Sequence, residues 1–221
     1  MAEQRLTWTA VAEVEVVRTP YRLTVVIPAY NEAASIAAVL GRVAGQLPDA
    51  ELIVVDDASA DDTAAIAESC GARVIRQAYN KGNGAAVKAG LRAATGEVVL
   101  LLDADGQHDP ADIPRVLAPI GPYDLVVAAR TRASNATKTR GAGNAALNRL
   151  ATYLTGMEVQ DLTSGFRAMK RAQIMEFIHL LPNRMSYPTT STMAFIKAGY
   201  SVKFVPIEAH KRTAGQSGQK L

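Results

Sequence analysis

The chain has 221 residues, of which 48% are hydrophobic and 20% are charged, so one α/β domain with a sizeable core is expected. Its formal net charge is only +3, and bulk charge therefore gives no argument for nucleic-acid binding. Cys70 is the single cysteine, which excludes an internal disulfide, and no CxxC or HExxH spacing indicates a zinc site. The sequence shows no secretory-signal pattern and no apolar stretch near the ~18 residues that span a bilayer. We therefore expect a soluble or at most peripheral protein.

Strands and helices alternate along most of the chain. Residues 1–20 carry a valine-rich alternation that ends at Pro20, and we expect an N-terminal arm or an added edge strand there. Residues 21–221 are expected to form one domain. Apolar runs predict strands at 23–27, 52–55, 73–75, 97–102, 125–128, 166–169 and 201–205. Helical patterns cover 32–44, 61–70, 84–94, 144–155, 171–181 and 188–198. This order predicts a mainly parallel central sheet with helices on both faces.

The segment after Arg130 changes character. Residues 131–142 are polar and rich in Gly, Asn and Thr, which is typical of a mobile loop. The next helix places a stripe of apolar residues at helical spacing, which is more often core than membrane contact; the stripe is Leu147, Leu150, Ala151 and Leu154. No acidic residue occurs between Asp124 and Glu158, whereas basic residues do. They form either a local surface that attracts phosphates or anionic membrane, or a plain solvated face; they are Arg130, Arg132, Lys138, Arg140 and Arg149.

Two carboxylates follow the apolar strand at 97–102. Asp103 and Asp105 stand at positions i and i+2, at the carboxyl end of a strand where open α/β sheets bind ligands. Paired hard oxygen donors suit Mg²⁺ or Mn²⁺, which proteins usually bind together with substrate phosphates. The alternative interpretation is a polar turn that leads into a helix at Asp109-Pro110.

The turns after the other strands narrow the class of ligand. Residues 28–32 contain no glycine, so they are not a dinucleotide GxGxxG turn, and no GxxxxGK[ST] loop is present. Asp57 ends the second strand at the same edge and is placed to accept hydrogen bonds from a base or ribose; the alternative is a helix-capping turn. Residues 80–84 offer backbone N–H groups and Lys81 to a phosphate, or form only a flexible helix entry.

Five motifs together carry a family resemblance. The segments PAYNE at 28–32, VVDDAS at 54–59, NKGNG at 80–84 and DADGQH at 103–108 resemble the family 2 inverting glycosyltransferases of GT-A fold. DLTSGFR at 161–167 resembles the branch that glycosylates polyprenyl phosphates, such as dolichol-phosphate mannosyltransferase. The resemblance spans about residues 23–217, with the motifs in order and correctly spaced.

The resemblance implies roles for individual residues. The nucleotide sugar would be held by Pro28, Tyr30, Glu32, Val55, Asp57, Lys81, Asp103, Ala104, Asp105, Arg130, Arg212 and Lys220. The metal ligands would be Asp103, Asp105 and Gln107, and the catalytic residues Asp161, Asp105 and Arg212. Arg130, Asp161, Ser164 and Arg167 would line the acceptor site. The tail matches R-x-x-G-x-S-K except that Gly218 stands at the lysine position and Lys220 follows two residues later.

The implied activity is transfer of a sugar from GDP-mannose or a UDP-sugar to a dolichyl or undecaprenyl phosphate, with Mg²⁺ or Mn²⁺ as cofactor. The implied partners are the nucleotide sugar, the lipid phosphate and the cytoplasmic face of a membrane, which the protein would meet as a peripheral enzyme. Alternatives are a soluble hydroxyl acceptor or a non-catalytic nucleotide-sugar binding module. A nucleotidyltransferase would need a Gly-rich first turn with a basic residue, and residues 28–32 are not such a turn. A polymer synthase would be expected to carry a QxxRW stretch, which does not occur in the sequence. The residues leave open the donor base, the sugar, and whether Asp161 is a base or positions the acceptor.

Overall fold

The computed structural model describes residues 16–131 and 138–208, and the side chains of 138–142 are outside the description. The expected roles of Arg212 and Lys220 therefore lie outside the described residues, as does most of the N-terminal arm at 1–20.

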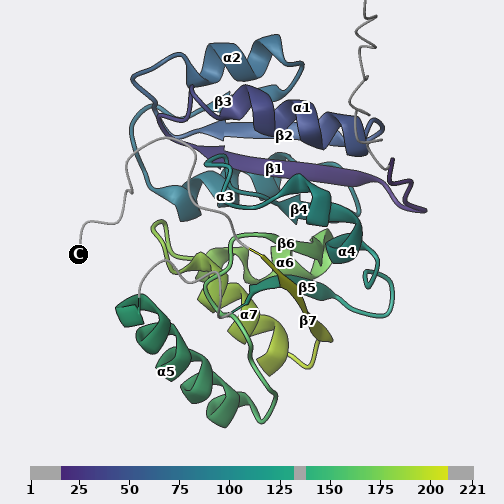
Figure 1. Ribbon diagram of the computed structural model, residues 1–221, viewed down its shortest axis with the longest axis vertical. Coiled ribbons are helices and arrows are strands. Elements are labelled where there is room, and N and C mark those ends of the chain that lie inside the picture. Colours follow the sequence, from purple (N-terminus) through teal and green to yellow (C-terminus); the bar gives the residue numbers. More distant parts are fainter. Residues whose placement is uncertain (1–15, 132–137, 209–221) are drawn as a thin grey trace, which may run out of the picture.

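A single seven-stranded sheet organises the molecule (Figure 1). Its strand order is β3-β2-β1-β4-β6-β5-β7, and β6 runs antiparallel to both of its neighbours while the other pairs are parallel. The strands are β1 (Leu23–Ala29), β2 (Glu51–Asp56), β3 (Arg73–Arg76), β4 (Val98–Leu101), β5 (Leu125–Arg130), β6 (Arg167–Lys170) and β7 (Val202–Ile207). The expected strands are confirmed, with ends that move by one or two residues.

Helices cover both faces of the sheet, so each central strand is buried on both sides. One face packs against α1 (Ile36–Gln46), α2 (Thr63–Ser69) and α4 (Ile113–Leu117), the last preceded by a 3-10 turn at Pro110–Asp112. The other face packs against α3 (Asn83–Ala93), α5 (Lys138–Thr155), α6 (Arg171–Phe177) with a 3-10 turn at Ile178–Leu180, and α7 (Tyr187–Lys197). Strand β1 shows why: Val25 and Ile27 point into the first core, and Val26 between them points into the second.

Helix α5 departs from the sequence prediction in two ways. It begins at Lys138, so the loop predicted for 131–142 is wrong for its last five residues. Its leucines are not core: Ala151 is 3% exposed, but Leu147, Leu150 and Leu154 are 39%, 54% and 50% exposed. The helix packs beside α7 at the periphery of the molecule, so only a narrow strip of it is covered (Figure 1). No helix within the described ranges has the length and apolar character needed to cross a bilayer.

Candidate active site

The carboxyl edge of the sheet gathers most of the predicted site residues. Strands β1, β2, β4 and β5 all end there, since they are parallel. Strand β6 is reversed, so it begins at this edge, and the segment 161–166 that precedes it arrives beside the ends of β4 and β5. Residues from the two halves of the chain therefore meet at one edge, as the strand order predicts for a ligand site.

Asp103 and Asp105 lie where β4 ends. The Asp103 side chain is 28% exposed, and its Oδ2 lies 3.7 Å from Nδ1 of His108. Asp105 is 6% exposed, and its Oδ1 accepts the backbone N–H of Gln107 at 3.0 Å. Burial raises the pKa of Asp103, and the charge of Asp105 raises it further, while His108 and the more distant arginines oppose the shift. The ionised carboxylate of Asp103 is thus held at some electrostatic cost, which an added cation would relieve.

Arg130 and Asp161 form a bidentate ion pair across this edge. Arg130 donates from Nε to Asp161 Oδ2 at 2.8 Å and from Nη2 to Oδ1 at 3.1 Å, and its backbone N–H also donates to Oδ2 at 3.2 Å. Nη2 further donates to the hydroxyl of Thr163 at 2.5 Å. Burial alone would raise the pKa of Asp161, but the hydrogen bonds and charge of Arg130 outweigh it and hold that pKa below its usual range. Asp161 is therefore an ionised anchor for Arg130.

Arg167 does not line an open site. Its side chain is fully buried, and it donates to the carbonyl oxygen of Ser164 from both Nε, at 3.1 Å, and Nη2. From Nη1 it reaches the carbonyl of Pro188 at 2.9 Å and the hydroxyls of Ser191 and Thr192 at 2.8 and 3.1 Å. Ser164 is also 0% exposed. Neither side chain is accessible in this structure, and their expected contact with the acceptor stays a prediction.

Asp57 accepts hydrogen bonds from the loop that precedes α3. It is 3% exposed, and its two oxygens accept the backbone N–H groups of Lys81 and Gly82, each at 2.8 Å. Asp57 therefore fixes the loop before α3 and engages two of the backbone N–H groups of residues 80–84. Pro28 and Val55 are buried and are paired with each other in neighbouring strands. The expected roles of Pro28, Val55 and Asp57 in holding the nucleotide stay predictions.

The turns after β1 and β2 are tied to each other. The backbone N–H of Asn31 donates to Ser59 Oγ at 2.9 Å, and the Asn31 side chain accepts the N–H of Ala60 at 2.8 Å. The N–H of Glu32 donates to the hydroxyl of Thr63 at 2.8 Å. Asn31 and Ala58 both have positive φ, 55° and 63°, which costs energy for residues other than glycine. The rigid turns leave Tyr30 47% exposed at the edge, where a flat ligand could stack on its ring.

Residues 24–177 match the glycosyl transferase family 2 model. The chain belongs to glycosyl transferase family 2. Among its relatives, undecaprenyl-phosphate mannosyltransferase from Micrococcus luteus is 30% identical, covering 89% of this chain and 86% of that protein. Polyprenol monophosphomannose synthase from Mycolicibacterium smegmatis is 31% identical, covering 91% and 82%. Dolichyl-phosphate hexose transferase from Haloferax volcanii is 34% identical, covering 88% and 85%.

A solved structure allows the fold to be compared as well as the sequence. Glucosyl-3-phosphoglycerate synthase from Mycobacterium tuberculosis, crystallised with Mn²⁺, UDP and glucosyl-3-phosphoglycerate, superimposes with a TM-score of 0.68. The identity is 24%, and the match covers 97% of this chain and 80% of that one. The expected GT-A fold and glycosyltransferase class are therefore confirmed. The individual site residues stay predictions.

The family 2 chain offers a donor set that fits Mg²⁺ or Mn²⁺. Asp103 and Asp105 would supply carboxylate oxygens, and the Gln107 amide would supply another. The described residues form no ready group of three or more His, Cys, Asp and Glu side chains for a metal. Two carboxylates suit an ion that completes its shell with water and substrate phosphates. His108, which the sequence prediction left out, adds a buried Nδ1 without a hydrogen-bond partner in the described part of the chain.

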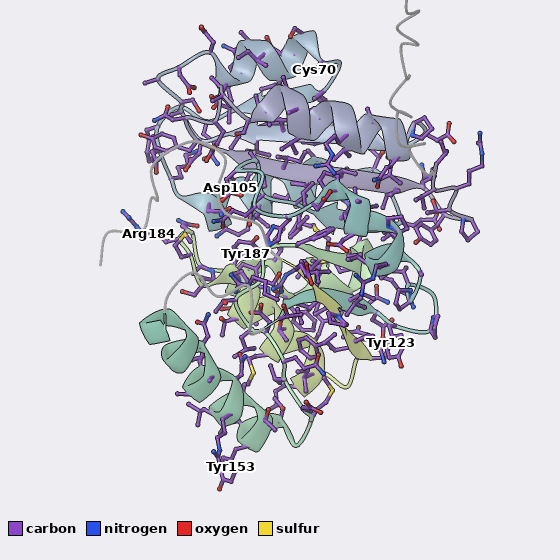
Figure 2. All side chains as sticks on the ribbon, viewed as in Figure 1. Cys70, Asp105, Tyr123, Tyr153, Arg184 and Tyr187 are labelled. Carbon is purple, nitrogen blue, oxygen red and sulfur yellow. The ribbon has the colours of Figure 1, made fainter. Side chains whose placement is uncertain are left out.

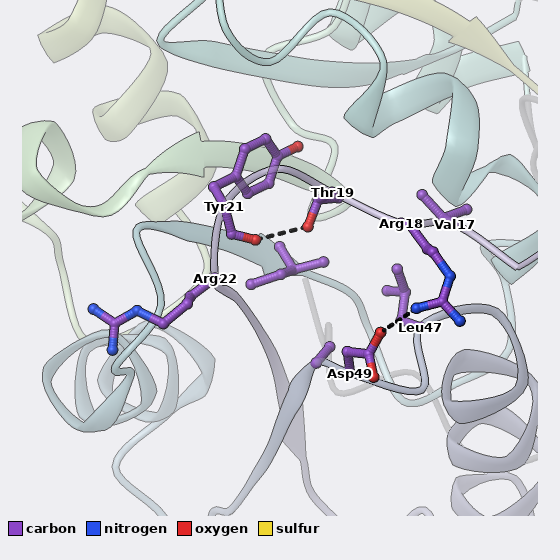
Figure 3. Close-up of a pocket in the computed structure, with 9 residues that line it drawn as sticks. Val17, Arg18, Thr19, Tyr21, Arg22, Leu47 and Asp49 are labelled. Carbon is purple, nitrogen blue, oxygen red and sulfur yellow. Dashed lines mark hydrogen bonds and ion pairs between the residues drawn. The ribbon is translucent and has the colours of Figure 1, made fainter.

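A surface cavity of about 290 Å³ lies elsewhere on the glycosyltransferase domain (Figure 3). It is lined by residues before β1 and before β2, among them Arg18, Tyr21 and Asp49. The amino ends of these strands are at the opposite edge of the sheet from Asp103. The cavity is therefore separate from the candidate site.

Proposed function

We propose that this family 2 glycosyltransferase transfers the hexose of a nucleotide-diphosphate sugar to a polyprenyl phosphate, with a divalent cation at Asp103 and Asp105. The observation that carries the proposal is the Arg130–Asp161 pair beside these carboxylates. It places a firmly held guanidinium at the edge where the donor diphosphate would lie. The names of the relatives given above, an undecaprenyl-phosphate mannosyltransferase, a polyprenol monophosphomannose synthase and a dolichyl-phosphate hexose transferase, support the same acceptor class.

Arg130 is suited to bind an anionic oxygen. Its hydrogen bonds to Asp161 and Thr163 use Nε and Nη2, and no acceptor among the described residues is paired with Nη1. The side chain remains 27% exposed. A guanidinium held by a carboxylate on one side presents its other N–H groups in a fixed direction, which favours phosphate recognition. We assign Nη1 to the acceptor phosphate or to the donor diphosphate.

The chemistry needs little help from a general base. Breaking the sugar–nucleotide bond places negative charge on the leaving diphosphate, and a divalent cation, when bound, stabilises that charge. A phosphate monoester has a second pKa near ~6, so it is already a nucleophile at neutral pH. Asp161 is paired with Arg130 and has a lowered pKa, which agrees with a positioning role. Arg130 then aligns the phosphate oxygen with the anomeric carbon.

The exposed apolar side chains of helix α5 support the proposal that the acceptor is a lipid. Leu150, Tyr153 and Leu154 are 54%, 84% and 50% exposed on the described surface, and Tyr153 points away from the body of the molecule (Figure 2). Arg149 is exposed on the same helix. An apolar strip with basic neighbours is the composition of helices that lie in a membrane interface. We propose that α5 rests on the membrane surface; attachment at its cytoplasmic face stays a prediction.

A product assay tests the function. Purified enzyme is incubated with GDP-mannose, GDP-glucose or UDP-glucose, together with a short polyprenyl phosphate, the matching polyprenol or 3-phosphoglycerate. Products are identified by mass spectrometry with Mg²⁺, Mn²⁺ or chelator. We expect metal-dependent transfer to the polyprenyl phosphate from one of these donors. Transfer to the free alcohol or to phosphoglycerate, with none to the lipid phosphate, would overturn the proposal and promote a different acceptor class.

Arg130 gives a sharper version of the test. Arg130→Lys keeps the charge but loses the bidentate fork, so we expect the acceptor KM to rise by ~10-fold or more. Arg149→Lys, on an exposed face of α5, is the matched control and should leave KM near the parent value. If the KM for the acceptor and the KM for the donor are both the same in the parent and in Arg130→Lys, the role of the guanidinium is refuted.

A further inference from the structure

Gly165 stands where the Asp103 carboxylate packs. A Cβ atom built on Gly165 would lie 2.5 Å from Oδ2, 3.0 Å from Oδ1 and 3.1 Å from Cγ of Asp103. A real Cβ does not approach an oxygen at 2.5 Å, so even a methyl group would force the carboxylate or the turn to move. The backbone of Gly165 is not in the left-handed region. Its conformation therefore does not require glycine, and the contact with Asp103 is what excludes a side chain.

Hydrogen bonds from Arg167 hold the turn that carries Gly165. The guanidinium holds the carbonyl of Ser164, the residue before Gly165, through two N–H groups. Its third nitrogen holds the start of α7 through Pro188 and Ser191. All the acceptors of Arg167 among the described residues are neutral, so the guanidinium is stabilised by dipoles. Its hydrogen bonds connect β6, the turn at 164–166 and α7. A buried arginine with this many bonds fixes the turn rather than binding a ligand.

The neighbouring strands complete the arrangement. In the sheet, Arg167 at the start of β6 pairs with Leu101 at the end of β4, two residues before Asp103. The turn at 164–166 and the end of β4 are therefore held side by side by the sheet register. Phe166 is fully buried and its ring lies 5.5 Å from that of His108, the other neighbour of Asp103. The Asp103 carboxylate is thus bounded by the turn on one side and by His108 on another.

We infer that Gly165 and Arg167 are positioning residues for Asp103: Gly165 leaves the space that its carboxylate occupies, and Arg167 holds the turn in place. The inference rests on the proposed function, in which Asp103 binds the metal and through it the donor diphosphate. Metal ligands have to be held within a few tenths of an ångström, and residues that orient them affect affinity by ~10- to 100-fold. A shift of the Asp103 carboxylate would therefore weaken metal binding without removing a ligand.

A double-mutant cycle tests the contact without metal or substrate. Tm is measured for the parent, Gly165→Ala, Asp103→Ala and the double variant, with Gly41→Ala as control because a Cβ there meets nothing within 4 Å. Overpacking typically lowers the Tm of a domain of this size by roughly 5 °C. We expect this loss for Gly165→Ala in the parent and little of it in the Asp103→Ala background, where the carboxylate is absent. Equal losses in both backgrounds would overturn the inference, and so would failure of both Gly165→Ala variants to fold.

Metal binding supplies the second readout. Free Mn²⁺ is followed by electron paramagnetic resonance with saturating UDP or GDP. We expect Gly165→Ala to weaken Mn²⁺ binding by ~10-fold or more, with nucleotide affinity in chelator unchanged. An unchanged Mn²⁺ affinity would overturn the inference. If the parent itself binds no Mn²⁺, the proposed metal site fails, while the thermal cycle still judges the packing between Gly165 and Asp103.

The variant Arg167→Met distinguishes a positioning role of Arg167 from an effect of its positive charge on metal binding. Removing a cation from beside a metal site would tighten Mn²⁺ binding if Arg167 acted only through its charge, because like charges repel. A positioning role predicts the opposite sign, a weaker Mn²⁺ affinity, because the Ser164 carbonyl loses its clamp and the turn loosens. Tighter binding in Arg167→Met would therefore overturn the role assigned to this residue.

Discussion

Replacing Asp161 with asparagine should expose how much the Arg130 pair contributes to the fold. The carboxylate is 8% exposed and accepts from three groups of Arg130 and two of Thr163. Removing one partner of a fully buried pair costs ~3–5 kcal/mol. Arg130 is 27% exposed, so water would partly resolvate it, and we expect a loss of about 2 kcal/mol. For a chain of this length that corresponds to a Tm lower by about 4–8 °C.

The pH dependence of this loss has a defined sign. Because the folded pKa of Asp161 is lowered, its contribution is fully present above the unfolded pKa near ~4 and disappears as pH falls through the folded pKa. The Tm difference between parent and Asp161→Asn should therefore be constant from pH 8 to about pH 5 and shrink below pH 4. Differential scanning calorimetry across this range measures it directly.

Asp124→Asn is the matched control for this prediction. Asp124 also accepts from a cation and a neighbouring residue, with Lys170 at 2.9 Å and Ser201 Oγ at 2.7 Å, but it lies at the opposite edge of the sheet. Both variants should be destabilised, whereas only Asp161→Asn should raise the acceptor KM. The reasoning is refuted if Asp161→Asn is as stable as the parent, or if Asp124→Asn impairs transfer equally.

Three further outcomes are expected. The double variant Leu150→Gln, Leu154→Gln should weaken binding to anionic vesicles in a flotation assay by ~10-fold or more. Its Tm should change little, because both side chains are exposed. The control Leu180→Gln, at a side chain that is 54% exposed on another element, should change neither vesicle binding nor Tm. Asp105→Asn should abolish the enhancement of UDP or GDP binding by Mn²⁺ in calorimetry, and retained enhancement would disprove its ligand role. Lys88→Met should lower Tm by about 2–6 °C, because Lys88 Nζ donates to Leu181 O at 2.9 Å and ties residues 181–183 to α3; an unchanged Tm would show that this tie is dispensable.

The sheet was predictable because its strands are buried on both faces and therefore read as apolar runs. The start of α5 was not, because residues 138–143, Lys-Thr-Arg-Gly-Ala-Gly, contain no apolar stripe and two glycines that favour a loop. The stripe that follows was correctly placed on a helix. Its exposure was hidden from the sequence, because periodicity shows that a helix has an apolar face but not what covers it.

The site was predictable as a set of positions and less so as a set of roles. Asp57 and Arg167 carry charges that ordinarily face solvent or ligand, which is why both were assigned to binding. Most of their partners are main-chain groups: the amides of Lys81 and Gly82 for the Asp57 carboxylate, and the carbonyls of Ser164 and Pro188, beside the hydroxyls of Ser191 and Thr192, for the Arg167 guanidinium. Main-chain partners leave no trace in residue type, so only the fold reveals them. Gly165 had a weak signal, as a glycine inside a recognised motif.

The reversed direction of β6 has a consequence for how this family can diversify. The chain leaves the sheet at Arg130 and re-enters it at Arg167 on the adjacent strand, at the same edge. Everything between these two points is an excursion whose ends lie next to each other. Such an excursion can be lengthened, shortened or replaced at a small entropic cost, without shifting the register of any strand. The part of the excursion before Asp161 can therefore vary in length while Asp161 and Gly165, which contact Arg130 and Asp103, keep their places beside the sheet.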